Sequence, residues 1–106
     1  MVQAKTELFS TELQEQAALF KALSHPARLA ILHYLAKTRV CITGDISEEL
    51  PLGRTTVNQH LLELKRAGLV QGQIQGVRTN YCLNPEGMEK MKMLMIGFTE
   101  ALGIVD

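Results

Sequence analysis

The first repeating pattern along the chain is an apolar residue at every third or fourth position. Its members are Leu13, Ala17, Phe20 and Leu23. Polar residues separate them, which predicts an amphipathic helix of about three turns. Pro26 is well placed to begin a second helix, because its missing N–H costs nothing at the first position. The segment Ala27 to Lys37 is apolar almost all round, so we expect this second helix at the centre of the core.

A short strand and a third helix are predicted next. Arg39 to Ile42 is short and contains β-branched residues, enough for a stub of strand. Thr43 can then cap a helix from Gly44 to Leu50, in which Asp45 would be favoured by the helix dipole. Pro51 to Gly53 do not continue a helix easily, so a tight turn is expected there.

A fourth helix and a hairpin follow that turn. The helix is predicted from Arg54 to Ala67 and ends at Gly68, as a residue with left-handed backbone would end it. Two short extended runs, residues 69–73 and 78–83, are separated by a turn near Gly76. They predict a β-hairpin.

The last predicted helix begins at Asn84 and Pro85 and carries a methionine-rich stripe. The members of the stripe are Met88, Met91, Met95, Phe98 and Leu102. No repeat, linker or low-complexity tract interrupts the pattern. A single domain over residues 1–106 is therefore predicted.

The fourth helix has two contrasting faces. Leu61 and Leu64 lie within about 40° of Val57 around the helix axis, whereas Thr55, Gln59 and Arg66 lie roughly opposite. Arginine can bind guanine through two hydrogen bonds, and asparagine or glutamine can do the same with adenine. The helix therefore has the side chains of a DNA-reading element, although an ordinary solvated face is the alternative. Against that alternative, Thr55, Thr56 and Asn58 are poor helix formers in an early turn.

Charge supports this interpretation only locally. The 106 residues hold 11 basic and 11 acidic side chains, so net charge gives no argument for nucleic acid. Residues 54–82, however, contain four basic side chains against Glu63 alone. The four are Arg54, Lys65, Arg66 and Arg78. This local excess would attract phosphates, unless it is a chance fluctuation.

Composition excludes several classes of protein. With 46% hydrophobic and 21% charged residues, the chain resembles an ordinary globular domain rather than a disordered one. No signal peptide and no long apolar span are expected, so a membrane partner is not predicted. Two cysteines at unrelated spacing make a disulfide framework unexpected, and a reducing cytoplasm is the default. No catalytic motif is recognisable, so an enzyme is not expected.

Three stretches of sequence resemble a known family. They are residues 20–32 (FKALSHPARLAIL), 56–61 (TVNQHL) and 65–70 (KRAGLV). Together they look like the bacterial ArsR/SmtB family of dimeric winged helix-turn-helix repressors. The resemblance implies a mainly α fold with a small β-hairpin wing, about five helices, and a homodimer formed by the first and last helices. It also implies that double-stranded operator DNA is the partner of a helix at 54–67 and a wing at 73–78.

The resemblance further implies roles for individual residues. The readers of bases or phosphates would be Arg54, Thr55, Thr56, Asn58 and Gln59, with Arg78 on the wing. Weaker candidates are His60, Lys65 and Arg66. His60 is equally compatible with a half-buried structural histidine, and Lys65 and Arg66 with an ordinary solvated helix end. The dimer interface would include Leu13, Ala17, Phe20, Met88, Met91, Met95 and Phe98.

Many members of the family respond to metals, but the usual ligands are missing. Ile42, Thr43 and Gly44 stand where a Cys-x-Cys pair would precede Asp45, and residues 86–106 contain no His or Cys. We therefore expect no metal, no cofactor and an unknown inducer. Cys41 and Cys82 could still form a thiol redox switch, although buried, unreactive cysteines are more common.

Two functions thus remain in competition. One is a sequence-specific repressor, with the thiol-responsive form as a variant of it. The other is a winged-helix protein-interaction module that has lost DNA binding, which net neutrality and the thin basic surface would suit. A salt titration separates them, because operator binding should weaken steeply with salt.

Overall fold

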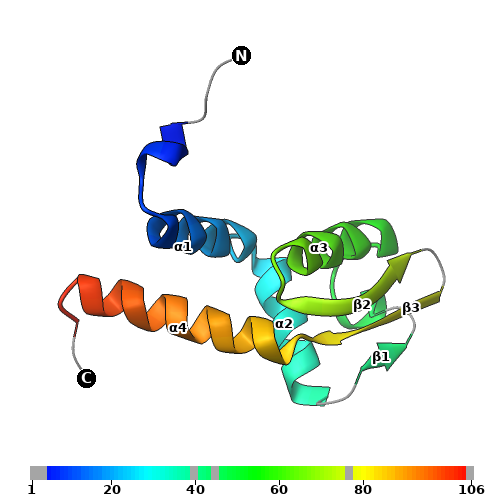
Figure 1. Ribbon diagram of the computed structural model, residues 1–106. Coiled ribbons are helices and arrows are strands. Elements are labelled where there is room, and N and C mark those ends of the chain that lie inside the picture. The colour runs from blue at the N-terminus through cyan, green and yellow to red at the C-terminus, as the bar shows by residue number, and fades with distance from the viewer. Residues whose placement is uncertain (1–4, 39–40, 44–45, 76–77, 105–106) are drawn as a thin grey trace.

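The computed structural model describes residues 5–38, 41–43, 46–75 and 78–104. Within these ranges the chain forms four α-helices, two short 3₁₀ turns and a three-stranded antiparallel sheet. Figure 1 shows helices α1 and α4 side by side at one end of the molecule, and α3 with the β2–β3 hairpin at the other. The winged helix-turn-helix arrangement predicted from the sequence is confirmed.

The first two helices follow the predicted pattern closely. After a 3₁₀ turn η1 (Lys5–Leu8), helix α1 spans Thr11–Ala22 and helix α2 spans Pro26–Thr38. Ser10 caps α1, because its hydroxyl accepts a hydrogen bond from the Leu13 backbone N–H at 3.2 Å.

The predicted third helix is replaced by a single turn. Strand β1 comprises only Ile42–Thr43, and the 3₁₀ turn η2 covers Ser47–Glu49. Gly44 and Asp45, where the helix was expected to begin, lie outside the described residues, as do Arg39 and Val40 of the expected strand. The turn is short because Leu50 already has an extended backbone, with φ −130° and ψ 147°, and Pro51 follows it.

Helix α3 and the hairpin agree with the prediction. Helix α3 spans Arg54–Arg66, and Gly68 follows it with a positive φ of 80°. Strands β2 (Val70–Gln75) and β3 (Arg78–Leu83) pair in register, and β1 joins the free side of β3. The expected turn near Gly76 lies outside the described residues.

Glycine is required at one position in this hairpin. Gly72 has a φ of 120°, and a Cβ atom there would overlap the backbone of Asn80 and Tyr81 on β3. The close approach of the two strands at this point therefore depends on a residue without a side chain.

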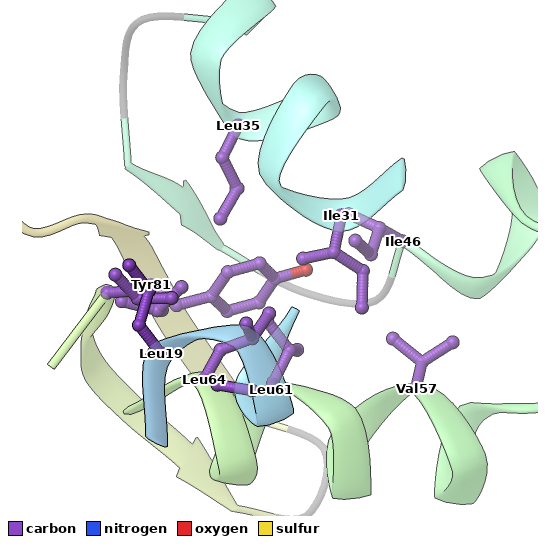
Figure 2. Packing of buried hydrophobic residues seen from close by; sticks show 11 residues of the cluster. Leu19, Ile31, Leu35, Ile46, Val57, Leu61, Leu64 and Tyr81 are labelled. Atoms are coloured by element: carbon purple, nitrogen blue, oxygen red, sulfur yellow. The ribbon is translucent and has the colours of Figure 1, made fainter. Parts of the chain in front are cut away.

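The core lies where α1, α2, α3 and the sheet meet. Tyr81 on β3 projects into its centre at 1% exposure, surrounded by leucine and isoleucine side chains (Figure 2). The neighbours labelled in Figure 2 are Leu19, Ile31, Leu35, Ile46, Val57, Leu61 and Leu64. Because α3 supplies three of these residues, its orientation is set by the core.

Helix α4 (Pro85–Ala101) packs along α1, and one of its faces lies against the edge of the core. Gln16 is buried at 4% exposure and donates through Nε2 to the Leu94 carbonyl oxygen at 3.3 Å. The rings of Phe20 and Phe98 meet edge to face with centroids 4.9 Å apart. Lys90 and Glu15 add an ion pair at 3.6 Å. The two helices thus form one arm, in which apolar packing is combined with a buried hydrogen bond.

The start of α4 is fastened to the end of α3. Asn84, the N-cap of α4, donates its backbone N–H to Leu69 and its side-chain amide to the Gly68 carbonyl oxygen, each at 3.0 Å. Gly87 lies so close to the Gly68 carbonyl that a Cβ atom there would overlap it. The end of α3 and the start of α4 are therefore in direct contact at this point.

Candidate nucleic-acid interface

Helix α3 separates its apolar face from its polar face as the sequence predicts. Val57, Leu61 and Leu64 are 0–1% exposed, so the apolar face is entirely covered. Thr55 and Gln59, on the opposite face, are exposed. The rigid core on one side holds the polar side chains on the other in a fixed orientation.

The first two turns of α3 present the predicted DNA readers to solvent. Arg54, Thr55 and Thr56 are exposed, and Asn58 is half-buried at the flank. Gly53 is the N-cap and has no side chain with which to cap the helix. The first-turn N–H groups and the positive end of the helix dipole lie at the end of α3 that carries Arg54, which suits contact with a phosphate.

The end of α3 differs from its beginning. Lys65 is exposed. Arg66 is also exposed, but its guanidinium donates to the Glu63 carboxylate at 2.5 Å, one turn back. Arg66 is thus already paired in the absence of DNA, which favours the solvated-end interpretation. On the wing, Arg78 begins β3, and its side chain lies outside the part of the chain that the structure describes.

His60 belongs to a cluster that joins three helices. The Nε–H of Arg28 donates to His60 Nδ1 at 3.1 Å, and Nη1 of Arg28 donates to the Ala22 carbonyl oxygen at 3.2 Å. The rings of His25 and His60 lie with centroids 4.4 Å apart. Burial of the ring, with the nearby charges of His25 and Arg28, lowers the pKa of His60 below its usual value. This environment favours a structural role for His60 over a contact with DNA.

The residues predicted for a dimer interface fall into two groups. Leu13 and Ala17 on α1 are exposed. The others are half-buried within the chain: Met88, Met91 and Met95 pack against the core, while Phe20 contacts Phe98. The members of this second group are Phe20, Met88, Met91, Met95 and Phe98.

Three exposed apolar residues near or on α4 were not singled out from the sequence. Met93 is 57% exposed, Ile96 38% and Ile104 57%, and Leu102 of the predicted stripe is 60% exposed. Met93 and Ile96 lie off the methionine stripe, so the spacing alone placed them among the solvent-facing positions. Their apolar character was the signal that could have found them.

Of the two alternatives for the cysteines, a pair or separate buried thiols, the structure has the pair. Cys41 and Cys82 are joined by a disulfide, and Cys41 is exposed. The reason is the pairing of β1 with β3, which brings two cysteines together across 41 residues of sequence. Within the described ranges, no three His, Cys, Asp or Glu side chains gather as metal ligands would. No helix in those ranges has the length and hydropathy needed to cross a bilayer.

Comparisons with known proteins agree with this geometry. A helix-turn-helix domain family matches residues 23–73. The chain is 32% identical to the HTH-type transcriptional regulator YgaV of Escherichia coli over 75 residues, 71% of this chain and 76% of that protein. It is 32% identical to the transcriptional repressor PagR of Bacillus anthracis over 83 residues, 78% of this chain and 83% of that protein.

A solved structure shares the fold. It is the homodimeric winged helix-turn-helix DNA-binding domain of Mb0332 from Mycobacterium bovis. The TM-score is 0.58 at 24% identity, with 94% of this chain and 91% of that chain covered. The polar face of α3, the wing and these relatives together lead to one conclusion. The chain belongs to the ArsR/SmtB family of winged helix-turn-helix transcriptional regulators, which bind DNA.

Proposed function

We propose that this regulator represses transcription as a homodimer that binds a palindromic operator through α3. One observation carries the proposal: α3 has its apolar face completely buried in the core while Thr55 and Gln59 stand exposed on the opposite face. A helix held in this way can lie in the major groove with its polar side chains against base edges.

The proposed contacts divide between bases and phosphates. Gln59 and Asn58 have the amide groups that pair with adenine, and Thr55 offers a hydroxyl and a methyl group. Arg54 and Thr56, beside the uncapped first turn, are suited to a phosphate. Arg78 on the wing would contact the neighbouring backbone. Lys65, His60 and Arg66 contribute less, for the reasons given above.

The dimer would form through the arm made by α1 and α4. All 17 residues of α4 are described, and none of them is fully buried. Met93 and Ile96 on α4, Leu102 directly after it, and Leu13 and Ala17 on α1 would meet the same residues of a second copy across a two-fold axis. The homodimeric state of the Mycobacterium bovis domain supports a homodimer, whichever surface forms it. A two-fold dimer then explains why the operator should be a palindrome.

The proposed partners are operator DNA and a second copy of the chain, so the protein would act where the DNA is. A transcriptional regulator of this kind acts in the bacterial cytoplasm and needs no catalytic activity or cofactor of its own. The relatives above are regulators rather than enzymes by name.

The test is a binding titration with a labelled duplex from the region upstream of the protein's own gene. Gln59→Ala should weaken binding to the preferred site about 5- to 150-fold and relax the preference at one base pair, because one bidentate contact is lost. Arg78→Ala should weaken binding to all sequences alike and reduce the slope of log K against log salt by about one. His33→Ala is the control and should have no effect, because His33 is exposed on α2, away from α3, the wing and the arm.

Two results would contradict the proposal. Equal effects of Gln59→Ala and His33→Ala would show that Gln59 on α3 does not read a base. Absence of any salt-dependent binding by a folded dimer, even at low salt, would favour the interaction module that has lost its affinity for DNA.

A further inference from the structure

Arg28, near the start of α2, is a half-buried cation that, among the residues the structure describes, is bound only by neutral groups. Its Nε–H donates to His60 Nδ1 at 3.1 Å, and its Nη1 donates to the carbonyl oxygens of Ala22 and Lys21 at 3.2 and 3.5 Å. The other terminal nitrogen, Nη2, makes no hydrogen bond to a described residue. A guanidinium partly removed from water is best compensated by an anion, so Nη2 is a donor that an external anion could meet.

His25 adds a second donor at the same corner between α1 and α2. Its Nδ1 accepts a hydrogen bond from the Ala27 backbone N–H at 3.0 Å, which leaves the proton of the neutral ring on Nε2. The side chain is exposed, and its ring lies against that of His60. Lys21, in the last turn of α1, is exposed as well. Within the described ranges no carboxylate pairs with Lys21, His25 or Arg28, so the corner favours negative charge.

The corner lies at the flank of the helix proposed above to read DNA (Figure 1). His60, which contacts the corner, follows Gln59 and lies about 100° from it around α3. The major groove is about 12 Å wide, which is close to the diameter of a helix with its side chains. With Gln59 directed at base edges, His60 therefore faces the wall of the groove, where the sugar-phosphate backbone runs. Thr56, exposed one turn before His60 on the same flank, is already among the proposed phosphate contacts.

We propose that Arg28 and His25 bind a backbone phosphate of the operator beside α3, and that His60 positions Arg28 for this contact. The inference rests on the proposed DNA-binding function and deepens it. Nη2 of Arg28 and Nε2 of His25 would donate to the phosphate oxygens, while Lys21 adds positive charge nearby. Burial lowers the pKa of His60, so its ring is neutral at neutral pH and Nδ1 keeps the lone pair that accepts from Arg28. A contact of this kind fixes the position of α3 in the groove without selecting a base.

A salt titration of DNA binding tests the role of Arg28. Arg28→Gln should weaken binding about tenfold, and equally for all duplex sequences, because a charge-assisted contact to the backbone is lost. The slope of log K against log salt should fall by about one for each protomer. Lys37→Gln is the matched control, since Lys37 is an exposed cation in the last turn of the same helix, and it should change neither quantity. A loss of affinity with an unchanged slope would show that Arg28 acts only through the fold, and would overturn the assignment.

Neutral methylphosphonates, placed one at a time in the operator, locate the contact. One position in each half-site should weaken binding of the unaltered protein about tenfold. Arg28→Gln should lose its sensitivity at this position and keep it elsewhere, whereas Lys37→Gln should keep the full pattern. His25→Ala, which removes an exposed side chain and should leave the fold intact, should weaken binding about threefold and reduce the sensitivity at the same position. Full sensitivity at every position in both Arg28→Gln and His25→Ala would overturn the proposal.

A double-mutant cycle tests the positioning role of His60. His60→Leu should weaken operator binding, and Arg28→Gln/His60→Leu should bind as Arg28→Gln alone does, because His60 acts through Arg28. Additive losses would overturn this role. If the unaltered protein binds no duplex at all, the proposed function and the phosphate site fail together. If it binds but the methylphosphonate pattern is the same in the variants, only the phosphate site fails.

Discussion

The arm made by α1 and α4 permits a quantitative test of dimer formation. Met93 is 57% exposed and Ile96 is 38% exposed. The apolar surface that the two residues expose in each protomer is therefore about that of one whole side chain. Full burial of a side chain of this size contributes about 1.5–3 kcal/mol. A two-fold interface contains each residue twice, so the pair would contribute roughly 3–6 kcal/mol to the dimer.

Replacing both residues by glutamine should remove most of that contribution. The dimer Kd is expected to rise about 10²- to 10⁴-fold, as measured by sedimentation equilibrium. Since both side chains are partly exposed in the monomer, the variant should keep its fold, and far-UV circular dichroism checks this. Leu29→Gln is the matched control, because Leu29 is 43% exposed on α2, outside the arm. If Met93→Gln/Ile96→Gln dimerises as tightly as Leu29→Gln, the interface does not lie on this face of α4.

Two further predictions concern stability. The pKa of His60 is lowered in the folded state from its ordinary 6.5, so the unfolded chain takes up the proton first as the pH falls. The free energy of unfolding should therefore decrease as the pH drops through 6.5, and urea melts should show a smaller decrease in His60→Gln. An identical pH dependence would contradict this assignment. Gly72→Ala should destabilise the hairpin by about 2 kcal/mol or more, because φ is 120° and the new Cβ meets the Asn80 backbone. A Tm unchanged by this substitution would show that the strands can separate at little cost.

The parts of the fold that the sequence predicted well are those set by local patterns. The burial of Val57, Leu61 and Leu64 follows from helical periodicity, and the left-handed Gly68 follows from its place after the helix. The exposure of Thr55 and Gln59 was predictable for the same reason, because they lie on the side of the helix opposite its buried face.

The parts that it predicted poorly depend on contacts between distant segments. A capping threonine and an acidic residue are compatible with a single 3₁₀ turn as well as with a helix, and the turn ends where Leu50 becomes extended. Spacing placed Met91 and Met95 on one face of the last helix but could not show that the chain's own core would cover them. The cysteine pair needed the register of β1 with β3, which no local pattern contains.

The contact between Asn84 and the Gly68 carbonyl has a consequence for which operators the protein can accept. In a two-fold dimer, the two copies of α3 must lie about 34–36 Å apart to enter successive major grooves. The distance between the two copies of α3 would depend on the orientation of α4 in the dimer interface. Asn84, at the start of α4, fixes that helix to the end of α3 through its 3.0 Å hydrogen bond to the Gly68 carbonyl oxygen. Substitutions that rotate the first turn of α4 would therefore change the tolerated distance between half-sites while every base contact stays the same.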